Sequence, residues 1–209
     1  QARVDDIAKG AALMTGTSFE RVFIDGTAEL LPNYCIEKIL YDNFIEIGVP
    51  GYEEDDWKLA AALRATYPQS DRAPGIGAKF NGEIEKQVKR LTENMSRDIN
   101  DFIMPLYSGT GFMAGSTDVG DVSWQTPTSQ IDVVTWPADI PNHSWQAVSC
   151  GKSGLAHKGM LTAGKVLAGA AVDLIENPAL LSAARAEFEE RSASGYVCPI
   201  EPGAIPIAL

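Results

Sequence analysis

The chain contains two histidines, and each lies in a sequence that could bring an imidazole to a reactive site. His157 comes at the start of the apolar stretch GLAHKGMLTAGKVLAGAAVDLI, residues 154–175, which we expect to form a buried helix. The first turn of a helix disfavours a charged imidazolium, so this position favours the neutral form that binds metal ions. His143, in PNHSWQ, is either a site residue or a partly buried structural histidine.

A metal site cannot be built from His157 alone, because a stable site needs about three or four ligands. The chain has no HxD, HExxH or CxxC pattern that would supply the others. From the residues alone, His157 is therefore either a metal ligand or a structural histidine. A nucleophilic triad is also unsupported, since Ser, His and Asp are present without a GxSxG turn.

The loop GSTDVGDVSW, residues 115–124, places hydroxyl and carboxylate groups between glycines. Such a loop either presents backbone N–H groups and carboxylates beside the end of a strand, or only turns the chain. Two acidic pairs, Glu53–Glu54 and Glu189–Glu190, are typical of solvated charges at a helix start and on a polar helix face. The sequence GKSG at 151–154 lacks the upstream glycine of a phosphate-binding loop.

The elements that must carry these groups follow from the spacing of apolar residues and from capping residues. Alternating apolar residues predict strands at SFERVFIDG (18–26), SQIDVVTW (129–136) and HSWQAVSC (143–150). Strands that alternate with helices predict an α/β fold. Helices are expected at 4–15, at 34–47 between Asn33 and Gly48, at 52–67, at 83–102, at 154–176, and after Asn177-Pro178.

The composition, with 45% hydrophobic and 22% charged residues, is that of a globular protein. A net charge of -11 argues against nucleic-acid binding, and no apolar run is long enough to span a membrane. Three widely separated cysteines, Cys35, Cys150 and Cys198, favour reduced thiols and a cytoplasmic location. The chain begins in what reads as the middle of an amphipathic helix, so we expect the natural N-terminus to lie upstream.

Several longer motifs carry a family resemblance. They are GAALMTGT, ELLPN, GSTDVGDVSWQTPT, HSWQAVSCGKSGLAHKGM and YVCPI. Together they resemble the metal-dependent amidohydrolases related to aminoacylase and carboxypeptidase G, and more narrowly the aminobenzoyl-glutamate utilisation protein B branch. The resemblance covers nearly the whole chain but only the C-terminal portion of such a protein.

The resemblance implies a fold in two parts. Residues 1–29 would be the last helix and strand of a βαββαβ lid and dimerisation domain. Residues 30–209 would be the second half of a zinc-peptidase-like catalytic domain, a mixed sheet flanked by helices. It also implies that His157 is the final metal ligand, and that Ser116, Thr117 and Asp118 belong to a substrate loop. His143 has no clear counterpart in the family and is kept as a substrate-site residue.

The chemistry implied by the resemblance is hydrolysis of an N-acyl amino acid, p-aminobenzoyl-glutamate or a relative, with two divalent metal ions, zinc or manganese. In the family the general base and the other ligands lie upstream, so this chain alone is expected to be inactive. The partners implied are a small-molecule substrate and a homo-oligomer or hetero-oligomer. The alternative is a non-catalytic subunit or binding domain that assembles with a paralogous hydrolase.

Overall fold

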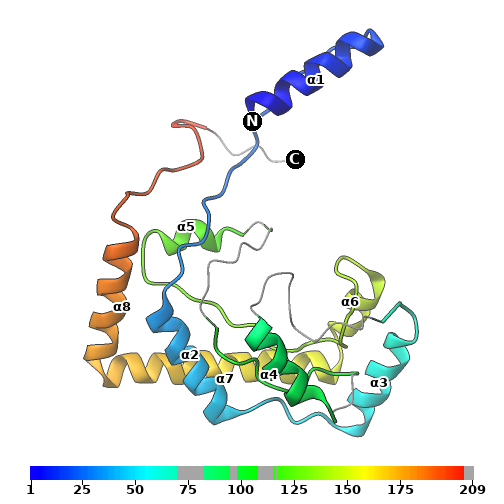
Figure 1. The fold of residues 1–209 in the computed structure, drawn as a ribbon, viewed down its shortest axis with the longest axis vertical. Coiled ribbons are helices and arrows are strands. Elements are labelled where there is room, and N and C mark those ends of the chain that lie inside the picture. The colour runs from blue at the N-terminus through cyan, green and yellow to red at the C-terminus, as the bar shows by residue number, and fades with distance from the viewer. Residues whose placement is uncertain (70–81, 95–97, 108–114, 116, 205–209) are drawn as a thin grey trace.

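The computed structural model describes residues 1–69, 82–94, 98–107, 115 and 117–204. Figure 1 shows α2, α7 and α8 packed together, α3 and α6 near the start of α7, and α1 projecting from the rest. The helices are α1 (Ala2–Thr15), α2 (Tyr34–Ile47), α3 (Glu54–Arg64), α4 (Gly82–Thr92), α5 (Val119–Ser123), α6 (Trp145–Cys150), α7 (Gly154–Glu176) and α8 (Pro178–Arg191).

The predicted α/β fold, with a mixed sheet flanked by helices, is wrong, because the described residues are helical and contain no strand. The stretches 18–26 and 129–136 were expected to be strands, but neither joins a ladder. No backbone–backbone hydrogen bond involves residues 127–137 in the part of the chain that the structure describes. A strand needs a neighbour to pair its N–H and C=O groups, and apolar alternation does not provide one.

Two further elements differ from the prediction. Residues 143–150 contain helix α6 instead of a strand, because the Ser144 side chain caps the helix by accepting a hydrogen bond from the Ala147 N–H at 3.2 Å. The polar helix expected over 83–102 is shorter, since α4 ends at Thr92. A window of about six residues holds too few periods to separate helix from strand.

The predicted ends of α2 and the predicted start of α8 are confirmed, whereas α3 (Glu54–Arg64) is shorter than the helix expected at 52–67. The Asn33 side chain caps α2 by accepting a hydrogen bond from the Ile36 N–H at 3.0 Å, and α2 ends at Gly48. Asn177 caps α8, and Pro178 occupies its first position. Caps act within about four residues, so they can be read directly from the sequence.

Helix α7 contributes to both apolar clusters of the described core. Its Leu155 and Val166 are fully buried, one in each cluster. The first cluster joins α7 to α3 and the second joins it to α2, so α7 is the central helix of the packed region. The buried members of the first cluster are Ala60, Leu63, Ile99, Cys150 and Leu155, and those of the second are Ile39, Leu40, Val166 and Ala170.

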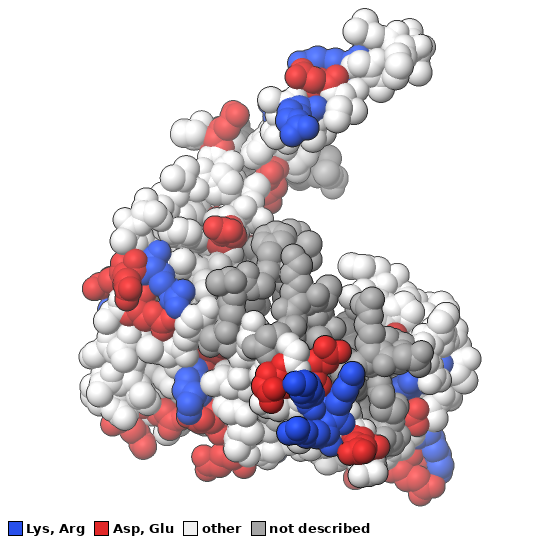
Figure 2. All heavy atoms as spheres, viewed as in Figure 1, with Lys and Arg blue, Asp and Glu red and all other residues white. Residues whose placement is uncertain are grey.

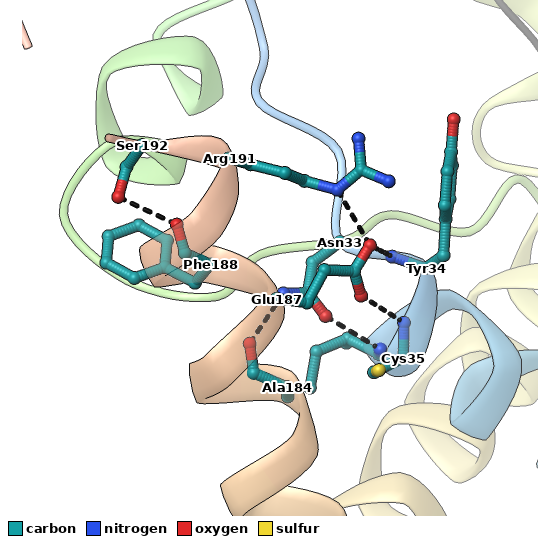
Figure 3. Close-up of polar contacts among 9 residues, drawn as sticks. Asn33, Tyr34, Cys35, Ala184, Glu187, Phe188, Arg191 and Ser192 are labelled. Atoms are coloured by element: carbon teal, nitrogen blue, oxygen red, sulfur yellow. Dashed lines mark hydrogen bonds and ion pairs between the residues drawn. The ribbon is translucent and has the colours of Figure 1, made fainter. Parts of the chain in front are cut away.

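Figure 3 shows the polar contact between α2 and α8. The Glu187 carboxylate on α8 accepts hydrogen bonds from the backbone N–H groups of Tyr34 and Cys35, at 3.0 and 2.8 Å. Burial raises the pKa of Glu187, but these hydrogen bonds and the Arg191 side chain outweigh burial and hold the pKa below its ordinary value. A charged carboxylate on α8 therefore holds the N-terminus of α2.

Helix α1 has no buried residue. Val4, Ile7 and Met14 recur at helical spacing along it and are 61%, 72% and 84% exposed. In Figure 2, the part of α1 farthest from the rest of the molecule consists of uncharged residues. This helix therefore leaves an apolar face uncovered.

No single helix in the described part of the chain is long and apolar enough to span a membrane. Helices α7 and α8 together have the length and composition of a span, but they are bent by 100° at the break between them.

Candidate functional site

The predicted metal ligand His157 lies on the first turn of α7, and its side chain is exposed. The Ser153 side chain caps this helix by accepting a hydrogen bond from the Ala156 N–H at 3.2 Å. The His157 N–H donates to the Ser153 carbonyl oxygen at 3.1 Å. The helix start is thus well defined, and the imidazole points to the surface, where it is free to meet another group.

The residue after His157 ties α7 to α3. The Lys158 ammonium lies 2.5 Å from an Asp56 carboxylate oxygen and 3.2 Å from a Glu53 oxygen. Asp56 is only 5% exposed and also accepts a hydrogen bond from the Glu53 N–H at 2.8 Å. Burial raises the pKa of Asp56, but the Glu53 and Lys158 hydrogen bonds outweigh it, so Asp56 remains ionised.

Glycine allows α7 to lie directly against the extended segment 129–136. A Cβ at Gly159 would collide with the Val134 carbonyl oxygen and with the Thr135 side chain. The buried Cys150 thiol contacts the Thr135 carbonyl oxygen at 3.4 Å, and burial raises its pKa. Cys150 is therefore a packing residue, since a buried thiol with a raised pKa is a poor nucleophile.

His143 lies in the loop before α6 with a left-handed backbone, φ 55°, and its side chain is exposed. Left-handed conformations are uncommon outside glycine and concentrate at functional sites. No hydrogen bond or ion pair in the described part of the chain joins His143 to His157, Thr117 or Asp118. The structure thus places both imidazoles on the surface without bringing them into contact.

Of the predicted substrate loop, Ser116 lies outside the described residues. Thr117 and Asp118 are exposed just before α5, and the Val119 N–H donates to the Thr117 hydroxyl at 3.3 Å. Asp118 stands at the N-cap position but makes no side-chain capping bond. Both side chains are therefore available at the surface.

The same loop contains a polar contact that the sequence did not reveal. Asp121 accepts hydrogen bonds from the Ala28 N–H at 3.2 Å and from the Tyr196 hydroxyl at 2.7 Å. The Trp124 ring N–H donates to the Glu29 carbonyl oxygen at 2.9 Å. The α5 region thus contacts both the segment at 28–29 and Tyr196. In the sequence, the feature that pointed to this contact was the carboxylate in a glycine-rich loop.

A groove of about 680 Å³ lies between α2 and the segments 100–107 and 130–136. Its described charged lining residues are Glu37 and Asp132, both acidic. The groove therefore suits an uncharged apolar group better than an anion. Its aromatic lining residues are Tyr41, Phe44, Tyr52, Phe102, Tyr107 and Trp136.

The described residues do not form a metal centre by themselves. Among them, no group of three or more His, Cys, Asp or Glu side chains is placed to hold a metal ion. The two-metal centre implied by the family resemblance therefore does not fit this part of the chain alone. A ligand role for His157 requires donors from outside the described residues.

Comparison with known proteins supports the narrower resemblance, to the aminobenzoyl-glutamate branch. The chain is 34% identical over 210 residues to one of the subunits of the p-aminobenzoyl-glutamate hydrolase of Escherichia coli (strain K12). The matched region is 99% of this chain and 43% of that protein, so the chain spans less than half the length of its relative. No family model and no solved structure matches the chain. The chain is thus similar to this p-aminobenzoyl-glutamate hydrolase subunit and corresponds to a portion of such a protein.

Proposed function

We propose that this chain is part of an amidohydrolase that cleaves p-aminobenzoyl-glutamate or a related N-acyl amino acid. The observation that carries the proposal is the 34% identity over 99% of the chain to a subunit named for that reaction. The exposed imidazoles and the exposed loop before α5 are consistent with it, because their side chains are free to meet a substrate or another part of the protein.

The proposed roles of individual residues follow the predictions from the sequence. His157 would supply one ligand to a divalent metal centre, zinc or manganese, whose other ligands lie outside the described residues. His143, Thr117 and Asp118 would contact the substrate. The left-handed backbone makes His143 a second candidate for the ligand, so the two histidines need to be tested together.

A second proposed function is that of a partner subunit. The relative is named as one subunit of a hydrolase, and this chain exposes an apolar face on α1. A solvent-exposed face of this kind is typical of a protein–protein contact. A paralogous hydrolase subunit would then cover α1, and the catalytic turnover could reside in either of the two proteins.

The test is to express the complete protein with and without a paralogous subunit and to measure release of p-aminobenzoate and bound metal. His157→Ala should lower metal content and activity while the melting temperature stays near that of the parent. His143→Ala should lower activity with less effect on metal content. Lys165→Ala, on the exposed surface of α7, is the control and should change neither.

Three outcomes would count against these roles. Full metal occupancy in His157→Ala with a lowered melting temperature would show a structural histidine. If His143→Ala loses metal and His157→Ala does not, the metal ligand is His143 and not His157. If the 209-residue chain alone binds two zinc ions stoichiometrically in a calorimetric titration, the expectation that other parts of the protein supply ligands is wrong.

A further inference from the structure

The loop that carries His143 is held in a strained conformation. Asp139 and His143 have φ values of 58° and 55°, and they are the non-glycine residues with positive φ in the described part of the chain. A side chain with this backbone carries an energetic cost, so the conformation persists only where surrounding contacts enforce it. The contacts that enforce it come from the end of α3.

The first contact is a buried guanidinium. Arg64, the last residue of α3, is 3% exposed, and its Nη2 lies 3.7 Å from the Asp139 carboxylate. Its Nε lies 3.6 Å from the Asp98 carboxylate. The Asp98 carbonyl oxygen in turn accepts a hydrogen bond from the Ala138 N–H at 2.9 Å. Arg64 therefore lies between the two carboxylates that border this end of the loop.

The second contact is a buried hydroxyl. Tyr67, three residues after Arg64, donates to the Ala138 carbonyl oxygen at 2.8 Å. Burial raises the pKa of Tyr67 to about 12, so its hydroxyl keeps its proton at neutral pH. Both the N–H and the carbonyl oxygen of Ala138 are thus fixed, directly before the left-handed Asp139.

The other end of the loop is fixed as well. The Ser144 hydroxyl donates to the Pro141 carbonyl oxygen at 2.6 Å. The Gln146 side-chain amide donates to the Thr66 hydroxyl at 3.2 Å. Thr66 lies just after α3, so this contact also comes from the end of that helix. In contrast, the exposed His143 ring makes no hydrogen bond in the described residues. The backbone is held by contacts on both sides of His143, whereas its imidazole ring is exposed.

The hydrogen-bonding capacity of the Arg64 guanidinium is only partly used. In the described part of the chain its Nε and Nη1 are buried without a hydrogen-bond partner, and its Nη2 donates a bond to the Gln69 side chain at 2.9 Å. A buried guanidinium with unpaired nitrogens is poor evidence of a stability role, because its desolvation is only partly compensated. We propose that Arg64 is a positioning residue, which holds Asp139 in its left-handed conformation and so sets the point at which the His143 side chain leaves the backbone.

This inference rests on the proposed function only in treating His143 as a site residue, and its main test does not require activity. With isotope-labelled histidine, the 209-residue chain gives two sets of ring signals, one from each histidine. His157→Gln assigns them. Asp139→Asn removes the carboxylate but keeps a residue type that tolerates the left-handed backbone. Asp42→Asn, at an exposed aspartate paired with Lys38, is the matched control.

We expect Asp139→Asn to shift or broaden the His143 signal while the His157 signal keeps its position. Arg64→Lys should change the same signal, because a lysine lacks the planar fork. Asp42→Asn should leave both signals in place. An unchanged His143 signal in Asp139→Asn overturns the proposal, and so do equal changes of both signals, which would show a general loss of structure.

An activity measurement on the complete enzyme separates this proposal from the proposed function. If His143 acts on p-aminobenzoyl-glutamate, Asp139→Asn should lower kcat about tenfold with little change in KM, as expected for a misdirected group. Full activity in His143→Ala would contradict the site role of His143. The ring signals would still decide whether Arg64 and Asp139 fix the imidazole.

Discussion

The Lys158 ammonium on α7 lies 2.5 Å from an Asp56 carboxylate oxygen on α3, a contact across 102 positions of sequence. Asp56 is nearly buried, while the Lys158 side chain is 27% exposed. The pair fixes the start of α7, which carries His157, against the start of α3. Neither residue shows this role in the sequence, where both read as ordinary surface charges.

Lys158→Met should destabilise the fold, because Asp56 would lose its cationic partner in a buried position. The expected loss is smaller than for a fully buried pair, since Lys158 is partly exposed and the Glu53 N–H still binds Asp56. Urea unfolding at pH 7 measures the change. Lys58→Met, at an exposed pair with Glu54, should cost less than about 0.5 kcal/mol, and equal losses would contradict a special role of Lys158.

Glu187→Gln should weaken the contact between α2 and α8 by about 1–2 kcal/mol, because a charged acceptor of two backbone hydrogen bonds is lost. Glu189→Gln is the matched control. Each glutamate pairs with an arginine four residues away on α8, but Glu189 is 62% exposed and Glu187 only 15%. Similar melting temperatures for the two variants would mean that the Glu187 contact contributes little.

The contribution of Glu187 should depend on pH in a defined direction. Its folded-state pKa is lowered, so its stabilisation is fully present above the unfolded-state pKa, about 4.3. The stabilisation is lost as the pH falls through the lower folded-state pKa. The difference in unfolding free energy between the parent and Glu187→Gln should therefore be constant from pH 7 to about 5 and shrink below about 4. If this difference in unfolding free energy instead grows as the pH falls, the pKa of Glu187 is raised on folding and the prediction is wrong.

Replacing two glycines of α7 by alanine should change the stability of the fold in opposite directions. Gly159→Ala should destabilise by about 1–3 kcal/mol, because its Cβ would meet the rigid Val134 carbonyl oxygen. A Cβ at Gly164 meets nothing within 4 Å, so Gly164→Ala should stabilise by about 0.5–1 kcal/mol through helix propensity. Thermal unfolding of the pair checks this, and a tolerated Gly159→Ala would contradict the close approach of α7 to 129–136.

Backbone amides of α1 should exchange with deuterium faster than those of α7. Helix α1 has no buried residue, whereas α7 has six. Exposed helices open locally at little cost, since no apolar packing opposes it. Hydrogen exchange monitored by mass spectrometry on the chain, alone and with a paralogous subunit, tests this. Slow exchange of α1 only in the presence of the partner would support assembly through α1.

Features that depend on neighbours within about four residues could be predicted from the sequence. Asn33 and Asn177 begin helices as predicted, and Gly48 ends one, because capping is a contact between a side chain or a backbone and the adjacent turn. The long motifs also indicated the relationship to a p-aminobenzoyl-glutamate hydrolase subunit, since a family pattern is a property of residue order.

Contacts between residues distant in sequence were needed to establish whether the alternating segments form strands and where the two histidines lie. A strand exists only with a neighbour to pair its backbone groups, and residues 127–137 form no such bonds in the described part of the chain. The contacts that fix His143 and the start of α7 join α3 to residues about 70–100 positions away. Their partners cannot be read from local spacing, because packing of α3 against the later segments is what brings the charges together.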